Sequence, residues 1–578
     1  MQVYRIDDIP LIYEQLRELR LSEIIDRSIK TSGSWQGISL GNLVCLWLCY
    51  LISESDHRLS PVESWASENL LLLQSLSGLP SLSSKDFTDD RLGLALDYLS
   101  DETNWHNFSH SFEGNSLSIY DLESLPTLRL DAAPMQGHHR IQEDGLFQKG
   151  HSKHHKNTGQ FKVMLATLDN EVNSFSYPLY HKVFSGEKAD DVLYRPVIEE
   201  CEKVFKSIGA LSPKLIVGDS KMGSQSLRSY IEQSGHFYLM PLSKIQLSQD
   251  KRIELIKQYL PLGLEPFYKK DKKGELVLVA EGFETSHQVN YIDKTTGSSH
   301  NWTERLLFVL SHNYAQSQQA AFEKKIKSAE SQLLELVKPK QGKKGIKSKT
   351  ELKQSINSIL SEKDLEAFLK VDIKDIIEIK YKRKYKDRPA GIEEIVSYQL
   401  IIKRNQKAIE DKKQIMGWQV YACNGCKQKL SLEQCIWKYR AQNRIESRFD
   451  NLRNKIAPLI PIFLQKDNRI EALVNLLMIA LKAISVMEYK AAKSLKEKNE
   501  ALANIYHGNP KQKTKTPTAK KMLTAFKGIS IVVFKDKNNI RVEMTTLNQT
   551  QMKIISLIGF KNSLYKKLID KIRISLSQ

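Results

Sequence analysis

The amino-acid sequence predicts a mixed α/β fold made of several domains. Its 578 residues are more than one hydrophobic core normally holds. Apolar residues recur at helical spacing through the first 118 residues, and this texture changes at TLRLD (127–131), where polar and apolar residues alternate as in a strand. The apolar run LIV (215–217), followed by a helical pattern, is typical of a buried strand next to a helix.

The elements of the predicted sheet follow the helical N-terminal module in order. After TLRLD, two more strand patterns occur at 161–170 and 173–184, and a helical pattern follows at 190–209. The strand around LIV and a second helix at 224–235 complete a mixed sheet with helices around it. Several strand patterns and a long helical pair then interrupt this order from about 237 to 429, which predicts an insertion.

The C-terminal part is predicted to return to helices and to end in a basic region. A helix begins near 432 and continues to about 456, and a very apolar helix follows at 472–489. Residues 490–527 carry ten lysines against two glutamates. Two short strand patterns and a closing amphipathic helix at 551–572 complete the chain.

The net charge favours a polyanionic partner. The chain has 86 Lys and Arg against 67 Asp and Glu, a formal charge of +19. Each cation that contacts a phosphate releases a counterion, so a surplus of this size favours nucleic acid, although many basic proteins have no such partner.

The composition also bounds the compartment and the metal chemistry. The start, MQVYRIDDIP, lacks the basic-then-apolar layout of a signal peptide, and the apolar runs at 43–52 and 473–487 are expected to be buried helices, so no membrane segment is predicted. Six cysteines in so long a chain fit a reducing cytoplasm. CNGC (423–426) with Cys435 lacks the second pair of a structural zinc site, which argues against zinc there.

Three acids stand out as candidate metal ligands. Asp131 and Asp219 are each expected to close a strand of the predicted sheet, and Glu446 projects from the helix near 432–456. On a helical projection Tyr439, Gln442, Glu446, Asp450 and Arg453 share a polar stripe beside an apolar seam. Carboxylates in such positions suit two-metal phosphoryl transfer, but strand-end aspartates are also common turn residues. A solvated amphipathic helix is the alternative for the stripe.

Four segments carry a resemblance to a known family. LRLDAAPMQGHH, GLFQKGHSKHHKNTGQFKVML, LIVGDSKMGS and YRAQNRIESRFDNLR, in this order, resemble the DDE transposases of bacterial insertion sequences. The resemblance covers most of the chain, including NWTERLLFVLS (301–311) and IAPLIPIFL (456–464). It implies a ribonuclease-H-like mixed sheet flanked by helices, split by a strand-and-helix insertion, with a helical N-terminal domain and a basic C-terminal region.

The resemblance implies a domain order and a catalytic triad. The implied domains are a DNA-binding domain (1–118), the first part of the catalytic core (119–236), the insertion (237–429), the second part of the core (430–489) and the basic region (490–578). Asp131, Asp219 and Glu446 match the three catalytic acids, which would hold two Mg²⁺ ions, or Mn²⁺ in their place.

The resemblance also implies DNA contacts. The family signature places Tyr, Arg, Glu and Lys on the last helix; Tyr439 and Glu446 match it, Arg453 replaces the Lys, and Gln442 replaces the Arg without keeping its charge. Lys153 and Lys156 lie in a loop that matches a family loop, and Lys221 follows Asp219. The remaining expected contacts come from Trp302 and from three basic stretches, at 338–349, 380–386 and 490–527.

Several alternatives stay open from the sequence alone. Solvated loops or linkers explain the same lysines, and a packed core residue explains Trp302. Five histidines (138, 139, 151, 154 and 155) form a possible zinc cluster. For the whole chain, the expected activity is cleavage at the terminal inverted repeats of a mobile element and joining of the 3′-hydroxyl ends to target DNA, by a cytoplasmic, nucleoid-associated homodimer. The alternatives are a two-metal nuclease without strand transfer and an inactive DNA-binding copy.

Overall fold

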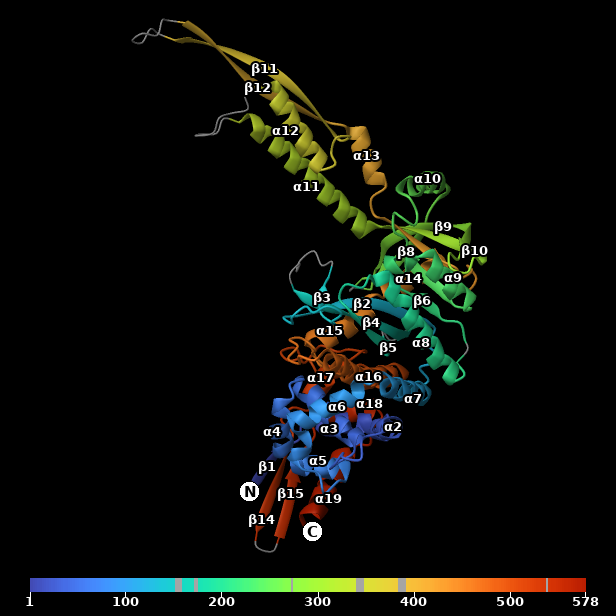
Figure 1. The fold of residues 1–578 in the computed structure, drawn as a ribbon, viewed down its shortest axis with the longest axis vertical. Helices are drawn as coiled ribbons and strands as arrows, with labels where there is room; N and C mark the ends of the chain where they lie inside the picture. The colour runs from blue at the N-terminus through green and yellow to red at the C-terminus, as the bar shows by residue number, and fades with distance from the viewer. Residues whose placement is uncertain are drawn as a thin grey trace. The chain divides into compact units, whose positions relative to one another are not determined.

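A computed structural model of the protein describes residues 1–150, 158–170, 175–210, 212–271, 274–338, 348–382, 391–536 and 539–577. The fold is mixed α/β, with a mixed sheet flanked by helices (Figure 1). The chain forms two compact units. Unit 1 consists of Met1–Met240, Asn290–Asn301 and Gln434–Gln578, and unit 2 consists of Pro241–Val289 and Trp302–Glu433.

The N-terminal part of unit 1 is helical, as predicted, apart from its first residues. Its helices are α1 (Ile9–Glu18), α2 (Leu21–Ser28), α3 (Leu40–Glu54), α4 (Ser60–Glu68), α5 (Leu70–Ser77), η1 (Ser84–Phe87), α6 (Asp89–Ser100) and α7 (Glu102–Tyr120). The prediction missed β1 (Gln2–Arg5), which pairs antiparallel with β14 (Ser530–Asp536). A strand of four residues at the chain start has no periodicity of its own, and only its remote partner selects it.

The sheet of unit 1 combines antiparallel and parallel strands. Its strands are β2 (Thr127–Gly137), β3 (Gln148–Lys149), β4 (Gly159–Asn170), β5 (Phe175–Ser185), β6 (Leu215–Val217) and β7 (Phe237–Pro241). β4 pairs antiparallel with β2, β3 and β5, whereas β6 runs parallel to β2 on one side and to β7 on the other. Most residues of β4 and β5 are buried, which fits a sheet covered on both faces.

Helices from distant parts of the chain cover this sheet. η2 (Asp190–Leu193) leads into α8 (Tyr194–Ser207), which packs on β4 and β5. η3 (Ser220–Gly223) and α9 (Gln225–Gln233) follow β6. α15 (Asn443–Asn454) packs on β2, β4 and β5, and α16 (Asp467–Glu497) also packs on β5.

α16 is the central helix of unit 1. By length and composition it could cross a membrane, the single such helix among the described residues, but 89% of its most apolar window is buried inside the protein. It contacts α1, α3 and α6 as well as the sheet, so it serves as a core helix. Lys482 interrupts its apolar sequence and forms a buried ion pair with Glu113 of α7.

The C-terminal elements return to the N-terminal helices. They are α17 (Ala519–Thr524), β14, β15 (Asn539–Met544), α18 (Gln549–Leu557) and α19 (Leu564–Ser577). β1, β14 and β15 form a three-stranded sheet, and α19 packs on β15 and α5, so both termini belong to one end of this unit (Figure 1). The predicted single closing helix is wrong: Gly559, at φ +79°, ends α18 with a backbone conformation that favours glycine.

Unit 2 contains strands and a helical pair. Its elements are α10 (Gln249–Tyr259), η4 (Leu260–Leu262), β8 (Glu265–Lys270), most of β9 (Leu276–Ile292) and of β10 (Ser299–Ser311), α11 (His312–Val337), α12 (Lys349–Glu362), β11 (Leu369–Lys382), β12 (Gly391–Arg404), α13 (Gln406–Gln414) and β13 (Trp418–Cys423). β11 and β12 form a long antiparallel hairpin. Ile326, Leu333, Leu352 and Leu369 belong to one apolar core that joins α11, α12 and the base of this hairpin.

A candidate active site on the mixed sheet

The strand register brings Asp131 and Asp219 to the same end of a parallel strand pair. β2 and β6 pair in parallel, and Arg129 lies opposite Val217, the last residue of β6. Asp131 follows Arg129 by two residues within β2, and Asp219 follows Val217 by two residues, just beyond the end of β6. The two acids are close enough for the charge of Asp219 to raise the pKa of Asp131.

One detail of this arrangement differs from the prediction. Asp131 was expected to end its strand, but β2 continues to Gly137 because β4 pairs with it along its whole length. The parallel pairing with β6 does end at Arg129. Asp131 therefore lies where β2 loses its partner on one side, and Asp219 caps η3 just beyond the end of β6.

Glu446 reaches this part of the sheet from α15. The predicted continuous helix over 432–456 is wrong, because α14 (Leu432–Arg440) ends before a turn at Ala441 and Gln442, and α15 begins at Asn443. The apolar seam was predicted correctly for α15, where Ile445, Phe449 and Leu452 are buried. Glu446 lies in the first turn of α15 and is exposed.

A buried arginine accounts for the break between the two helices. Arg129 is 1% exposed and its Nε donates to Asp169 Oδ2 at 2.7 Å, within the sheet. Its Nη2 donates at 2.7 Å to the carbonyl of Lys438, which in a continuous helix would accept from the backbone N–H of Gln442. Breaking a buried ion pair of this kind costs about 3–5 kcal/mol, so Arg129 can impose its geometry on the helix end.

Gln442 connects this buried pair to the candidate active site. Its Oε1 accepts a hydrogen bond from Arg129 Nη1 at 3.3 Å, and its Nε2 donates to Asp131 Oδ2 at 3.4 Å. The other oxygen of Asp131, Oδ1, accepts from the backbone N–H of Ala132 at 2.9 Å. A side-chain amide can accept from a guanidinium through its oxygen and donate to a carboxylate through its nitrogen at the same time.

Asp219 is held by a buried tyrosine. The hydroxyl of Tyr194, which is 1% exposed, donates to Asp219 Oδ1 at 2.6 Å, and the backbone N–H of Lys221 donates to the same oxygen at 2.9 Å. Burial and the charge of Asp219 raise the pKa of Tyr194 above its ordinary value, so this hydroxyl stays protonated. Both hydrogen bonds described for Asp219 use Oδ1, which leaves Oδ2 available as a ligand.

The three acids interact through their charges. Burial, together with the negative charges of Asp219 and Glu446, raises the pKa of Asp131 to about 6, against the hydrogen bonds from Ala132 and Gln442. Burial and the charges of Asp219 and Asp131 also raise the pKa of Tyr439 to about 12. Asp131, Asp219, Glu446 and Tyr439 therefore share one electrostatic environment, in which a cation would relieve the repulsion among the carboxylates.

The donor set fits a hard divalent cation. Carboxylate oxygens are the ligands that Mg²⁺ prefers, and it retains water in its other positions. The ligand atoms of the three acids are not all within 4.8 Å of one another; among the described residues, the group that meets this spacing lies on α7 and α8. Mutual repulsion keeps uncompensated carboxylates apart.

The structure describes some of the predicted DNA-contact residues, and their surroundings differ. Lys221 Nζ forms an ion pair with Asp190, and Arg453 lies on α15 with its guanidinium 5.9 Å from the Phe449 ring. Trp302 lies on β10 in unit 2 and is 5% exposed, so the ring would have to be uncovered before it could hold a base. Lys153 and Lys156 lie outside the described residues, as do most of 338–349 and part of 380–386.

The His-rich loop is described only in part. His139 Nε2 lies 2.7 Å from the carbonyl oxygen of Leu464, and its ring stacks on Phe147 at 4.1 Å. His151, His154 and His155 lie outside the described residues. For His139 the structure therefore gives a packing contact, and the zinc alternative for the loop stays a prediction.

Sequence reasoning missed four residues of this site, namely Arg129, Lys162, Asp169 and Tyr194. Lys162 Nζ lies 2.5 Å from Asp190 Oδ1, so Asp190 holds Lys162 and Lys221 together. One signal was present for Arg129 and Asp169: a charged residue within an otherwise apolar strand has to find a partner. Nothing in the sequence marks Tyr194 or Lys162.

Comparisons with known proteins do not assign the chain. No protein-family model matches it, and no curated protein matches it. The case for a function therefore rests on the residues and their geometry.

Proposed function

We propose that the protein is a DDE transposase with a ribonuclease-H-like catalytic core. The observation that carries this proposal is the position of Asp131 on β2 and of Asp219 just beyond the end of the neighbouring parallel strand β6, together with the charge interactions of Asp219 and Glu446 with Asp131. Three carboxylates, from a strand, the end of its neighbour and a later helix, are what two-metal phosphoryl transfer requires. The mixed sheet, with antiparallel strands on one side and parallel strands on the other, supports the proposed core.

Asp131, Asp219 and Glu446 would hold two Mg²⁺ ions, which Mn²⁺ could replace. When bound, the ions would supply charge stabilisation for in-line displacement at a phosphodiester. The chain's own residues fix the ligands: Tyr194 orients Asp219, and Gln442 orients Asp131. Outer partners of this kind set ligand direction and affinity in metal sites.

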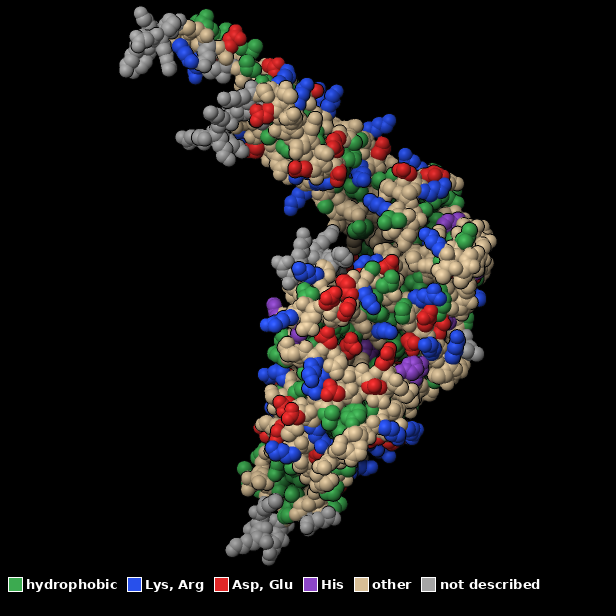
Figure 2. Space-filling view, viewed as in Figure 1, with side chains coloured by type: hydrophobic (Ala, Val, Ile, Leu, Met, Phe, Trp, Pro, Cys, Tyr) green, Lys and Arg blue, Asp and Glu red, His purple; other side chains and the backbone are tan. Residues whose placement is uncertain are grey.

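The DNA would be bound by lysines and arginines around the acids. Lys162 and Lys221 form a cationic pair around Asp190, and Arg453 follows Glu446 on α15. In this proposal the N-terminal helices recognise terminal inverted repeats, the basic stretches bind the phosphate backbone, and two copies process paired ends before joining them to target DNA in a bacterial cytoplasm. Basic and acidic side chains are interspersed over the visible face (Figure 2), so specific positions rather than overall charge would have to guide the DNA.

The test compares two substitutions on the same helix. Purified protein and Mg²⁺ are incubated with a plasmid that carries the gene and its native flanks, and nicks, excision and joined products are mapped. Glu446→Gln removes one proposed ligand charge, while Asp450→Asn, one turn along α15, removes an exposed charge that pairs with Lys455 at 3.0 Å. We expect the wild type and Asp450→Asn to cut at the element ends and Glu446→Gln to bind DNA without cutting.

Other outcomes point to other functions. Cutting without joined product would favour a two-metal nuclease, and binding without cutting under Mg²⁺ or Mn²⁺ would favour an inactive DNA-binding copy. Equal cutting by Glu446→Gln and the wild type would show that Glu446 is not a ligand that cleavage requires.

A further inference from the structure

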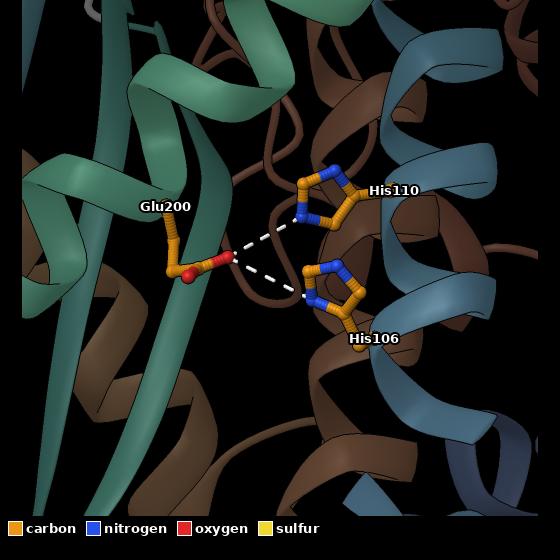
Figure 3. A group of neighbouring side chains, drawn as sticks. All are labelled: His106, His110 and Glu200. Atoms are coloured by element: carbon orange, nitrogen blue, oxygen red, sulfur yellow. Dashed lines mark hydrogen bonds and ion pairs between the residues drawn. The ribbon is translucent and has the colours of Figure 1, made fainter. Parts of the chain in front are cut away.

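A second group of potential metal ligands lies on α7 and α8, away from the three acids. His106 and His110 are four residues apart on α7, so both imidazoles face the same side of the helix. Glu200 on α8 faces them (Figure 3). The ligand atoms of these three residues lie within 4.8 Å of one another.

The two imidazoles converge on one carboxylate oxygen. His110 Nε2 lies 3.3 Å and His106 Nδ1 3.8 Å from Glu200 Oε2, and the ring centroids are 4.2 Å apart. In a tetrahedral zinc site with bonds near 2.1 Å, neighbouring donor atoms are about 3.4 Å apart. The two histidine–glutamate distances therefore lie close to this value, and the two imidazole nitrogens are within 4.8 Å of each other.

The surroundings of the group also suit a metal. Lys203 Nζ holds the other oxygen of Glu200, Oε1, at 2.7 Å, as an outer partner that orients the ligand. The His106 side chain is 49% exposed, and Figure 2 shows histidine side chains at the surface where Figure 1 places α7 beside α8, so an ion and a water ligand have access.

We propose that His106, His110 and Glu200 bind a Zn²⁺ ion that fastens α7, the last N-terminal helix, to α8 of the sheet domain. Two imidazoles and one carboxylate select zinc over Mg²⁺, which prefers oxygen ligands alone. Three protein ligands leave a fourth position for water. The ion connects two helices that already pack together, so its effect is to stabilise this contact, and the proposal does not depend on the transposase activity.

The test is a zinc titration of the untagged full-length protein after extraction of metals with a chelator. Excess Mg²⁺ is kept present to occupy carboxylate sites, and binding is followed by calorimetry. His110→Gln and Glu200→Gln each remove one ligand. The matched controls are His507→Gln, at an exposed histidine elsewhere in unit 1, and a double variant of the His-rich loop, His154→Gln with His155→Gln.

We expect each ligand variant to lose one equivalent of bound Zn²⁺, or to bind that equivalent at least about 100-fold more weakly than the wild type. Loss of an outer partner alone costs about 10–100-fold in metal affinity, and loss of a ligand should cost at least as much. Both control variants should bind the same number of Zn²⁺ equivalents as the wild type. Zn²⁺ should raise the Tm of the wild type and not that of His110→Gln, and Co²⁺ should give a visible absorption band that Glu200→Gln loses. An unchanged zinc equivalent in both ligand variants, its loss in the loop variant, or no Co²⁺ band in the wild type would each overturn the proposal. Circular dichroism of the metal-free variants checks their folding, and the absence of a Co²⁺ band in the wild type would overturn the proposal even if a variant unfolds.

Discussion

Arg129 and Asp131, two residues apart on β2, are joined through the side-chain amide of Gln442. Gln442 accepts from Arg129 at 3.3 Å and donates to Asp131 at 3.4 Å. Arg129 is in turn fixed by its buried pair with Asp169. The position at which the resembling family carries an arginine thus holds a neutral residue here, and a neighbouring strand supplies the positive charge behind it.

Substitution of Gln442 should disturb Asp131 in two distinguishable ways. Gln442→Leu removes both hydrogen bonds, and we expect DNA cleavage to fall by about 10–100-fold, the usual loss for an outer partner of a metal ligand. Gln442→Glu keeps a partner for Arg129 but places a negative charge beside Asp131, which should raise the pKa of Asp131 and move the acid side of the pH–rate profile upward. Gln465→Glu, at an exposed site, is the control. Wild-type rates and profiles in both Gln442 variants would contradict the proposed role of the amide.

Asp131 should reduce the stability of the metal-free protein at neutral pH. Its pKa in the folded protein, about 6, lies above the ordinary value of 3.8. The folded state therefore binds more protons than the unfolded state between these values, and the free energy of unfolding falls as the pH rises from about 4 to 6. The two-unit difference limits the effect to at most about 3 kcal/mol.

Asp131→Asn removes this cost, so its Tm in a chelator at pH 7.5 should be a few degrees above that of the wild type. The difference should vanish near pH 4, and Mg²⁺ should raise the Tm of the wild type alone. Asp191→Asn, at an exposed acid of η2, should show neither effect. If Asp131→Asn had a lower Tm than the wild type at pH 7.5, neighbouring groups would already offset the charge of the Asp131 carboxylate in the metal-free protein.

The hydroxyl of Tyr194 should matter more for cleavage than for folding. Tyr194→Phe keeps the buried ring and loses the 2.6 Å hydrogen bond to Asp219. We expect cleavage to fall by about 10–100-fold and the Mg²⁺ requirement to rise, because Asp219 is no longer oriented. Tyr230→Phe is a close match, since Tyr230 donates to Glu202 at 2.9 Å outside the site. If cleavage fell equally in the two variants, the effect of Tyr194→Phe would be explained by general destabilisation.

Lys221 and Asp190 should affect DNA affinity in opposite directions. If Lys221 contacts a phosphate, Lys221→Ala should weaken binding of all sequences and reduce the slope of log K against log salt by about 1. Asp190→Asn frees Lys162 and Lys221 from their shared carboxylate and should strengthen binding. Fluorescence anisotropy across a salt series measures both, with Lys251→Ala, a lysine of an exposed helical ion pair in unit 2, as the control. If Lys221→Ala left the slope of log K against log salt unchanged, Lys221 would not contact a phosphate.

The local pattern of the sequence was enough for most secondary structure and for naming three candidate acids, but not for Arg129, Lys162, Asp169 or Tyr194. Alternation identified the beginning of β2, an apolar run identified β6, and helical spacing identified the seam of Ile445, Phe449 and Leu452. These features could be read locally because burial imposes a period of two on strands and about 3.6 on helices. The insertion expected at 237–429 stays a prediction as a domain, and the compact unit in that part of the chain consists of 241–289 and 302–433.

Only the tertiary structure decided how these pieces meet. Asp131 lies within β2 rather than at its end because β4 continues the pairing, and the helix breaks before α15 because Arg129 takes the carbonyl of Lys438. The roles of Gln442 and Tyr194 come from partners 311 and 25 residues away, respectively. The sequence by itself determined which side chains were candidates for chemistry, because periodicity and residue type are local properties. The folded chain determined their register and their charges, because pKa values and hydrogen bonds depend on neighbours that no local pattern specifies.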